Sequence, residues 1–404
     1  MKIAIFHNLT SGGAKRSLYE IVRRICDRNQ IDIYTLQTAN HDFCDIRPYV
    51  NSHKIYPFQP GKLFHSPFGR LNALIRTLDL VKLRELGKFI AKDIEQNKPD
   101  LVFFEPCQFE NAPSVLRYIH DLPTVFYCHE PYRILYEEQP PRPYYKNKSA
   151  FRRVADSIDP FLFLYNKLLR KNDFQNIRHA DRVFVNSNYT KKQVERIYGI
   201  EAIVSYLGVD TDKFHPLANV QKSTFILSVG SLTPLKGFDF IIRSLALLPP
   251  DKRVPLVISS NFTNDEELNF LTDLAKTKNV RVYFMSNISD DKLVELYNSA
   301  TLTAYTPYRE PFGLVALESM ACATPVVGVR EGGLLETVQD QVTGRLVERN
   351  ESIFSHSIMD LLQNPLKARE YGNKSLQDVK EKWSWSASIQ KIQENFEKAV
   401  PNRT

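Results

Sequence analysis

The sequence contains few cysteines and no long apolar run. Its 404 residues include five cysteines, an odd number with no C-x-x-C pair and no zinc-like spacing. A disulfide framework and a structural zinc site are therefore not expected, and a reducing cytoplasm is the simplest compartment. No stretch of 18 apolar residues occurs, so we expect no membrane-spanning segment. The apolar run at the N-terminus, MKIAIFHN, is too short for a signal peptide and predicts a first strand.

Two phosphate-binding motifs are also missing. The glycine pair Gly12-Gly13 follows the first predicted strand, and apolar residues then recur with helical spacing from Leu18 to Ile25. Such a turn lets the backbone approach a phosphate or a sugar closely, but it also occurs without any ligand. The chain has no complete G-x-G-x-x-G and no G-K-[ST] motif. This absence disfavours a P-loop enzyme and a two-domain NAD-linked dehydrogenase.

The composition is that of a soluble globular protein with a mild excess of positive charge. Hydrophobic residues make up 43% of the sequence and charged residues 25%. A chain of 404 residues is too long for one ordinary core and predicts two or three domains. The formal net charge of +7 fits anionic ligands or an anionic membrane surface, and it does not argue for nucleic acid as a partner.

Short apolar strands alternate with amphipathic helices along the chain. In the first half we expect strands at residues 2–6, 31–36, 100–104, 124–127, 182–185 and 202–206, and helices at 71–95 and 112–120. A second series has strands at 224–229, 255–258, 280–284, 302–305 and 325–328, with a helix at 290–298. This order predicts an α/β protein with two parallel sheets, each covered by helices on both faces. Ligands of such sheets bind beyond the carboxyl ends of the strands.

The most informative stretch runs from Tyr305 to Pro325 and reads YTPYREPFGLVALESMACATP. Its residues predict a strand, a loop and a helix. Glu310 lies in the loop and Glu318 about two helical turns later, so both carboxylates can face one cleft. Unpaired N–H groups at the helix start, near Phe312, favour an anion. This combination suits a sugar joined to a phosphate, although the glutamate spacing alone also fits an amphipathic helix with a solvated Glu318.

The E-P-F-G-x-x-x-x-E pattern from Glu310 to Glu318 resembles the signature of the retaining glycosyltransferases of family 4. The resemblance implies the GT-B fold, in which two Rossmann-like, doubly wound parallel-sheet domains face a cleft. Residues 1–215 would form the acceptor-side domain, residues 216–385 the nucleotide-sugar domain, and a terminal helix at 386–404 would pack back on the first domain. By the same resemblance, Glu310 would contact hydroxyls of the donor sugar and Glu318 the ribose.

A second motif, Gly230-Ser231-Leu232-Thr233-Pro234-Leu235-Lys236-Gly237, is similar to the family pattern G-R-L-x-x-x-K-G. The Arg and Lys of that pattern hold the donor diphosphate, but here Ser231 occupies the Arg position. Lys236 is therefore expected to neutralise most of the phosphate charge. Losing one charge-assisted hydrogen bond, worth about 1.5–3 kcal/mol, should weaken donor binding or slow departure of the leaving group. The residues expected to bind the donor are Gly12, Gly13, Gly230, Ser231, Lys236, Glu310, Phe312, Gly313, Leu314, Val315 and Glu318.

Two further patterns bear on the donor site. Glu331-Gly332-Gly333 and Glu336 match the family's G-G-x-x-E turn and helix start. Asp210-Thr211-Asp212 imitates a D-x-D metal motif, but it falls where the segment joining the two domains is expected, and the resembling family handles the leaving group without a metal ion. We therefore expect no metal and no cofactor beyond the donor itself.

The catalytic residues implied by the resemblance are His129, Lys236 and Glu310. His129 follows a predicted strand in FYCHEP, and a histidine at this point in the family lies beside the donor sugar or the acceptor. The alternative is a histidine that only hydrogen-bonds neighbouring backbone. Glu105 and Glu130 also follow strands, and either could bind acceptor hydroxyls.

The stretch from Tyr132 to Phe174 is rich in basic and aromatic residues. Basic groups beside large apolar ones could seat the first domain on an anionic bilayer and admit a lipid-linked acceptor. The competing interpretation is a long helix that packs into the core of that domain. The residues concerned include Tyr144, Tyr145, Lys146, Lys148, Arg152, Arg153, the run 161–165, Lys167, Arg170 and Lys171.

These features predict a metal-independent, anomer-retaining hexosyltransferase of polysaccharide biosynthesis. It would use a UDP- or GDP-sugar and act on a hydroxyl of a glycan or lipid-linked glycan, in the cytoplasm and as a peripheral protein on the inner face of the membrane. The alternatives are a nucleotide-sugar epimerase of the same fold and a catalytically degenerate donor-binding subunit of a transferase complex.

Overall fold

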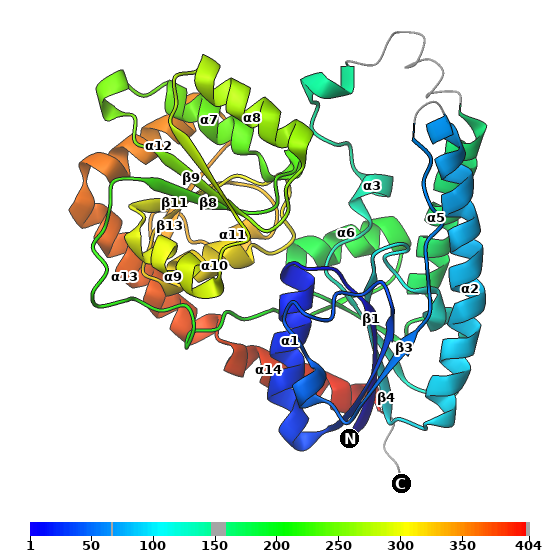
Figure 1. Ribbon diagram of the computed structural model, residues 1–404. Coiled ribbons are helices and arrows are strands. Elements are labelled where there is room, and N and C mark those ends of the chain that lie inside the picture. Colours follow the sequence, from blue (N-terminus) through cyan, green and yellow to red (C-terminus); the bar gives the residue numbers. More distant parts are fainter. Residues whose placement is uncertain (66–67, 147–158, 401–404) are drawn as a thin grey trace.

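The computed structural model describes residues 1–65, 68–146 and 159–400, which form two α/β lobes (Figure 1). Each lobe contains one parallel sheet. The N-lobe sheet has seven strands within the described residues, in the order β3-β2-β1-β4-β5-β6-β7. Its strands are β1 (Lys2–Asn8), β2 (Gln30–Leu36), β3 (Ser52–Tyr56), β4 (Leu101–Cys107), β5 (Thr124–Cys128), β6 (Arg182–Val185) and β7 (Ile203–Val204).

Helices cover both faces of the N-lobe sheet. On one face, Leu18 of α1 and Ile389 of α14 belong to a buried cluster that includes Ile3 of β1. On the other face, Ile90 of α2 and Val194 of α6 belong to a second buried cluster, which includes Ala4 and Phe6 of β1. The elements are α1 (Gly13–Ile25), α2 (Asn72–Gln96), α3 (Arg133–Tyr136), α5 (Pro160–Ile177), α6 (Asn188–Tyr198) and α14 (Trp385–Ala399), with 3-10 turns η1 (Cys26–Arg28), η2 (Arg47–Tyr49), η3 (Phe68–Leu71), η4 (Ser114–Tyr118) and η5 (Pro143–Lys146).

The C-lobe repeats this architecture. Its sheet has six strands within the part of the chain that is described, in the order β10-β9-β8-β11-β12-β13. The strands are β8 (Ile226–Val229), β9 (Leu256–Ser260), β10 (Val282–Ser286), β11 (Leu302–Tyr305), β12 (Val326–Val329) and β13 (Gly344–Val347). The helices are η6 (Pro234–Lys236), α7 (Phe238–Ala246), η7 (Pro250–Lys252), α8 (Asp265–Thr277), α9 (Asp290–Ser299), α10 (Leu314–Ala321), α11 (Leu334–Thr337), α12 (Glu351–Gln363) and α13 (Pro365–Lys382).

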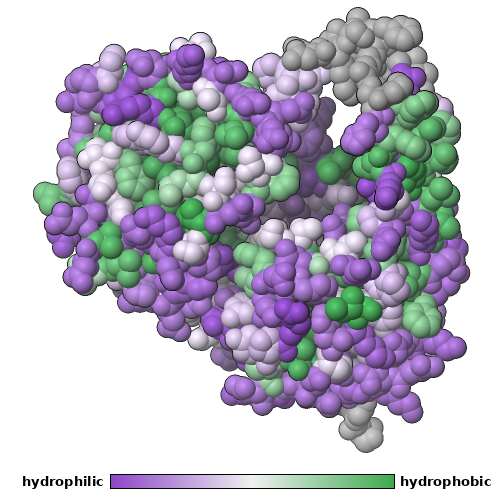
Figure 2. Space-filling view, in the orientation of Figure 1, coloured by the Kyte–Doolittle hydropathy of each residue, from purple (hydrophilic) through white to green (hydrophobic). Residues whose placement is uncertain are grey.

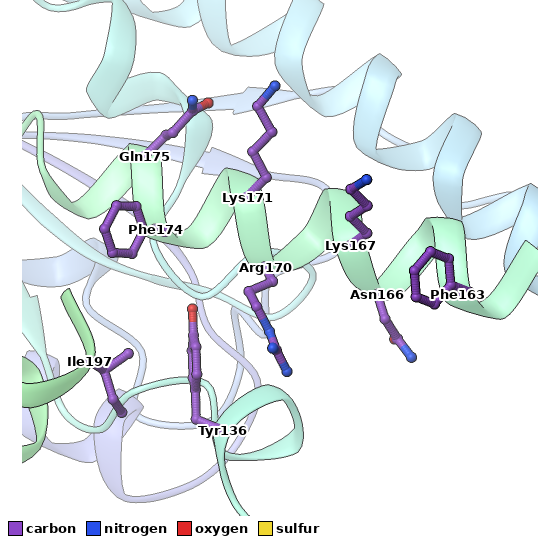
Figure 3. Close-up of a pocket in the computed structure, with 9 residues that line it drawn as sticks. All are labelled: Tyr136, Phe163, Asn166, Lys167, Arg170, Lys171, Phe174, Gln175 and Ile197. Atoms are coloured by element: carbon purple, nitrogen blue, oxygen red, sulfur yellow. The ribbon is translucent and has the colours of Figure 1, made fainter.

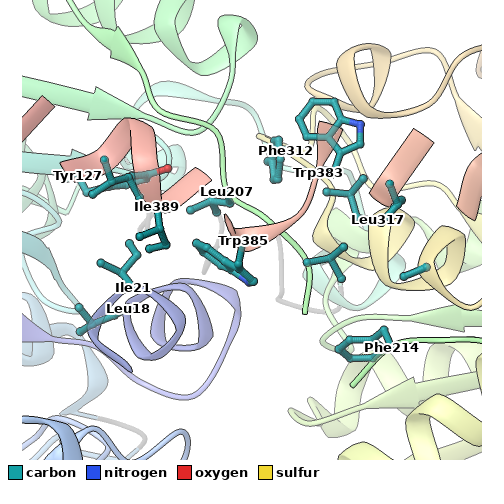
Figure 4. Close-up of a cluster of buried hydrophobic side chains, with 14 of the residues drawn as sticks. Leu18, Ile21, Tyr127, Leu207, Phe214, Phe312, Leu317, Trp383, Trp385 and Ile389 are labelled. Carbon is teal, nitrogen blue, oxygen red and sulfur yellow. The ribbon is translucent and has the colours of Figure 1, made fainter. Parts of the chain in front are cut away.

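Two chain segments cross between the lobes, and they run side by side. The backbone N–H of Val209 donates to the carbonyl oxygen of Trp383 at 2.8 Å. Gly208 packs so closely on Trp385 that an added Cβ would lie 2.6 Å from its backbone nitrogen. Trp385 also belongs to a buried apolar cluster that includes Leu18 of the N-lobe and Phe312 of the C-lobe (Figure 4). The lobes therefore share a continuous core at their junction.

The structure confirms the predicted α/β architecture with two parallel sheets. The α-helix expected at 112–120 is wrong, because this short segment forms η4. Pro113 precedes the turn, and Ser114 donates to Glu110 through its N–H and to the carbonyl oxygen of Leu83 through its hydroxyl, at 2.9 and 3.2 Å. The sequence pattern did not reveal β3 and β13, since β3 is a largely exposed edge strand and β13 has only four residues.

The stretch 132–174 is not one long helix. Pro140, Pro141 and Pro143 separate α3 from α5, and the segment 139–146 leaves the N-lobe and reaches the C-lobe (Figure 1). Lys148, Arg152 and Arg153, which contributed to the membrane hypothesis, lie outside the described residues. Among the residues that are described, no helix combines the length and apolar character needed to cross a membrane.

Candidate active site

The ammonium group of Lys236 lies 2.9 Å from Glu310 Oε2 at the carboxyl end of the C-lobe sheet. Lys236 ends η6, and its side chain extends over Gly230, where an added Cβ would lie 3.2 Å from the lysine stem. The next residue, Gly237, has φ of 67°, and a Cβ there would lie 2.3 Å from the carbonyl oxygen of Thr306. Glycine is therefore required for this loop to approach the end of β11.

The loop that carries Glu310 is fixed by the Gly332-Gly333 turn. The N–H of Gly333 donates to the carbonyl oxygen of Glu310 at 2.8 Å. A Cβ on Gly332 would lie 2.3 Å from that same oxygen, and one on Gly333 would lie 2.0 Å from the carbonyl oxygen of Pro311. The two glycines thus fix the position of the Glu310 backbone. A side chain at either position would collide with the backbone of the Glu310 loop.

Electrostatics keep Glu310 ionised. Burial opposes ionisation, but the nearby Lys236 ammonium, the Arg133 guanidinium and a hydrogen bond from Tyr305 outweigh it and lower the pKa of Glu310. Arg349 supports the same loop by donating to the carbonyl oxygens of Thr306 and Pro307, both at 3.0 Å. The site therefore contains a charged carboxylate and a charged amine before any ligand binds.

The start of α10 faces the start of α1 across the gap between the lobes. Gly313 has φ of 97° and precedes α10, and the N–H of Ala316 already donates to the carbonyl oxygen of Gly313 at 3.0 Å. The N–H groups of Leu314 and Val315 come before this first helical hydrogen bond. A Cβ added at Gly13 would lie 3.6 Å from the Leu314 side chain. Two helix N-termini, each with a partial positive charge, thus meet in the cleft.

Glu318 is buried on the face of α10 that turns toward the N-lobe, with 7% of its surface exposed. The hydroxyl of Tyr297 donates to Glu318 Oε2 at 2.9 Å. Burial raises the pKa of Glu318, and the charge of Arg16 from α1 partly offsets this increase. Arg16 itself forms two hydrogen bonds with Asp290, at 2.7 and 3.0 Å, and so joins the lobes beside Glu318.

His129 and Glu105 form a hydrogen-bonded pair on the N-lobe side. His129 Nε2 lies 2.8 Å from Glu105 Oε2, and the ring of Tyr127 lies 4.6 Å from the imidazole. Glu105 is fully buried, and burial raises the pKa of its carboxyl group. The expectation that Glu105 binds acceptor hydroxyls finds no support in this geometry, because its carboxylate is buried and hydrogen-bonded to His129. Sequence reasoning placed Glu105 at a strand end but missed this partner.

The predicted donor residues are only partly brought together. Lys236 and Glu310 meet beside the start of α10, which is formed by Gly313, Leu314 and Val315, with Gly230 under the lysine stem and Gly13 next to the Leu314 side chain. Gly12 precedes α1, and an added Cβ there would have no atom within 4 Å. Phe312 is buried against Tyr206 and Trp383, so only its backbone can contribute to a ligand site. Ser231 is half-buried at the start of the Lys236 loop. Asp210 of the D-x-D triplet pairs with Arg23 at 2.5 Å, which commits its carboxylate to a contact within the N-lobe.

Sequence reasoning missed three arginines that contact the loops of Lys236 and Glu310. Arg133 of α3 donates to the carbonyl oxygen of Tyr308 at 2.7 Å and so contacts the Glu310 loop from the N-lobe. Arg142 enters the C-lobe between α7 and α8, and Arg349 supports the loop from within the C-lobe. The sequence around Arg142, P-P-R-P, is a signal of rigid extended backbone, but it does not indicate where that backbone leads.

Comparison with known proteins gives two family matches. Residues 11–213 match the family model described as Glycosyltransferase Family 4, and residues 209–378 match the one described as Glycosyl transferases group 1. A D-inositol 3-phosphate glycosyltransferase of Mycobacterium sp. (strain KMS) is 33% identical over 230 residues, which cover 53% of this chain and 51% of the relative. One of Nocardiopsis dassonvillei is 30% identical over 363 residues, which cover 83% and 78%. The chain thus spans about half the length of the first curated relatives it matches.

Solved structures show the same fold. Sucrose-phosphate synthase from Thermosynechococcus elongatus superposes with a TM-score of 0.74 at 19% identity, covering 98% of both chains. Anabaena Alr3699/HepE, in complex with UDP and glucose, gives a TM-score of 0.71 at 18% identity and covers 98% of this chain and 99% of its own. At such low identity these likenesses establish the two-lobed architecture alone.

Proposed function

Because the chain belongs to glycosyltransferase family 4 and has the GT-B fold, we propose that it transfers a hexose from a UDP- or GDP-sugar to a hydroxyl group. The transfer retains the anomeric configuration and uses no metal ion. The acceptor is a glycan or a lipid-linked glycan, and the reaction takes place in the cytoplasm, on the inner face of the membrane.

One observation carries this proposal: the Lys236 and Glu310 side chains lie 2.9 Å apart beside the N-terminus of α10. In the free protein the amine and the carboxylate satisfy each other. A bound donor offers a better partner to each group, because its diphosphate attracts the ammonium and its sugar hydroxyls donate to the carboxylate. The N–H groups of Leu314 and Val315 complete the diphosphate site. The UDP and glucose in the Anabaena structure support a nucleotide sugar as the ligand class.

The proposed reaction needs stabilisation of one developing charge. The bond between C1 of the sugar and the phosphate oxygen breaks, and its electron pair leaves with the nucleotide. The acceptor oxygen bonds to C1 on the same face, and its proton passes to the departing phosphate oxygen. Lys236 and the α10 amides neutralise the phosphate charge, which is electrostatic catalysis by groups already in place.

Other residues orient the two substrates. Glu310 holds hydroxyls of the donor sugar, and Glu318, already bonded to Tyr297, accepts from the ribose. His129 presents its ring to the reacting face, and Glu105 fixes the orientation of that ring. Glu130, which has 44% of its side chain exposed beside Arg133, remains available to acceptor hydroxyls.

The test is sugar transfer by Glu310→Gln and Lys236→Ala, with Glu397→Gln and Lys391→Ala on the exposed face of α14 as matched controls. Loss of one charge-assisted hydrogen bond should lower kcat/KM by roughly 10- to 100-fold in each site variant. Unchanged transfer in both site variants would refute the assigned roles. Release of an epimer from the donor alone would instead indicate an epimerase.

A further inference from the structure

Large apolar side chains are exposed together at one end of the N-lobe. We call this surface the apolar tip; it comprises Leu63, Phe64, Phe68, Leu74, Phe161, Leu162, Phe163 and Leu164, whose exposed fractions range from 37 to 71%. These residues come from the segment before η3, from η3, from the start of α2 and from the first turn of α5, which pack against one another. Figure 2 shows a hydrophobic surface over the upper parts of α2 and α5. So many exposed apolar residues in one place indicate an interaction surface.

A groove continues from this tip along α5. Its volume is about 740 Å³, and its apolar walls are formed by Phe163, Phe174, Tyr136 and Ile197 (Figure 3). Phe163 belongs to both the tip and the groove. The two features therefore form one continuous surface that offers apolar side chains to a partner.

The charges along the groove are positive. Lys167 and Lys171 lie one turn apart on the exposed surface of α5, and neither forms an ion pair with a carboxylate of the described residues. Arg170 lies over the ring of Tyr136 at 5.6 Å and donates to a backbone carbonyl oxygen. The acidic residue in this part of α5, Asp173, is buried and accepts from Tyr136 and Tyr198. The exposed surface thus combines aromatic and cationic groups without an exposed acid on this part of the helix.

One short helix separates this groove from the active site. Arg133, the first residue of α3, contacts the loop of Glu310 through the carbonyl oxygen of Tyr308. Tyr136, the last residue of the same helix, lines the groove. The four residues of α3 therefore connect the groove directly to the loop that carries Glu310.

We propose that the apolar tip and the groove bind the surface of an anionic phospholipid bilayer. The tip enters the interface between head groups and acyl chains, while Lys167, Arg170 and Lys171 contact lipid phosphates. This orientation places α3 and the cleft next to the leaflet, so that a lipid-anchored acceptor reaches His129 without leaving the membrane. The statement about the acceptor rests on the proposed function, whereas the statement about bilayer binding does not.

The test is co-sedimentation of the full chain with vesicles of phosphatidylglycerol and with vesicles of phosphatidylcholine. We expect binding to the anionic vesicles, little binding to the neutral ones, and loss of binding at high salt. The test variants are Leu162→Asp/Phe163→Asp and Lys167→Glu/Lys171→Glu. Each should lower the partition coefficient for anionic vesicles by roughly tenfold or more. The matched controls Leu366→Asp and Lys276→Glu/Lys278→Glu change exposed residues of the C-lobe and should bind as the parent protein does.

Three results with vesicles would overturn the proposal: no binding by the parent protein, equal binding to neutral vesicles, or unchanged binding by both test variants. A dimer in vesicle-free buffer that is lost in Leu162→Asp/Phe163→Asp would also overturn it, because the tip would then be an interface between copies of the chain. Donor binding, measured separately by thermal shift with nucleotide sugars, reports on the proposed function alone. If the protein bound vesicles but no nucleotide sugar, the proposal of membrane binding would stand and the proposed reaction would be refuted.

Discussion

The guanidinium of Arg142 donates to the carboxylate of Glu267 at 2.9 Å, although the two residues belong to different lobes. The same guanidinium donates to Asp239 at 2.9 Å and to the carbonyl oxygen of Pro234 at 3.2 Å. Glu267 is fully buried and Asp239 nearly so. Pro234 begins η6, which ends at Lys236. An arginine of the N-lobe therefore neutralises two acids of the C-lobe and contacts the loop of the proposed donor site.

Replacing Arg142 by Met should weaken both the C-lobe and donor binding. The change leaves two carboxylates buried without a cation, which typically costs about 3–5 kcal/mol of unfolding free energy. It also frees the Pro234 loop, so we expect the donor KM to rise several-fold. The measurements are denaturant unfolding and steady-state kinetics with varied donor.

A double variant separates the two effects. Arg142→Met/Glu267→Gln removes one of the two unpaired buried carboxylates. It should recover much of the unfolding free energy while the donor KM stays high. If the donor KM returned to the parent value together with stability, Arg142 would have a structural role only and would not position the loop.

Gly333→Ala should displace Glu310 without unfolding the protein. The new Cβ would lie 2.0 Å from the carbonyl oxygen of Pro311, so the Glu310 loop must move. We expect kcat/KM to fall at least about tenfold and the unfolding free energy to fall by about 1–3 kcal/mol. Gly69→Ala is the control, because its Cβ has only Asn72 nearby, at 3.9 Å. Parent-like transfer by Gly333→Ala would show that the position of Glu310 is not critical.

Introducing the missing cation by Ser231→Arg should strengthen donor binding. A second charge-assisted contact to the diphosphate is worth about 1.5–3 kcal/mol, so the dissociation constant for the nucleotide sugar should fall by roughly tenfold or more. Calorimetric titration measures this change, with the exposed Thr277→Arg as a control for net charge. Equal affinities of the two arginine variants would show that residue 231 does not face the diphosphate.

Glu110 should make stability depend on pH. Burial raises the pKa of its carboxyl group to about 7, while a glutamate in an unfolded chain titrates near about 4.3. The folded state thus holds this proton more tightly. The resulting contribution to the unfolding free energy is complete below about pH 4.3 and is lost as the pH rises through about 7.

Glu110→Gln tests this dependence, because the amide cannot ionise. Between pH 5 and pH 8, the variant should gain stability relative to the parent by on the order of 2 kcal/mol in urea unfolding. Glu397→Gln, on the exposed face of α14, is the control and should follow the parent curve. Parallel pH curves for parent and Glu110→Gln would contradict the prediction.

Local patterns in the sequence predicted much of the fold and the centre of the site. Ser187 follows the predicted strand at 182–185 and caps α6 by accepting from the N–H of Thr190 at 2.9 Å, as serine commonly does at a helix start. The proximity of Lys236 and Glu310 followed from their two motifs, because both loops leave the carboxyl end of the same sheet. Such predictions succeed where the information lies within one strand, loop and helix.

The contacts between lobes could not be predicted in this way. Arg142 is separated from Glu267 by 125 residues, and Arg133 from Tyr308 by 175. Nothing in the local spacing of either pair indicates that they meet. The apolar tip could not be predicted for the same reason, since residues near 64 and 163 become neighbours only when α2 and α5 pack together.

The hydrogen bond between Val209 and Trp383 has a mechanical consequence. This hydrogen bond joins the two segments that connect the lobes, so the two segments act as a single hinge. We therefore expect the cleft to open by rotation about an axis near Gly208, where the close packing on Trp385 leaves little room for translation. The segment 139–146 reaches the C-lobe on the side away from the two crossing segments in Figure 1, so the ion pairs of Arg142 with Asp239 and Glu267 oppose this rotation.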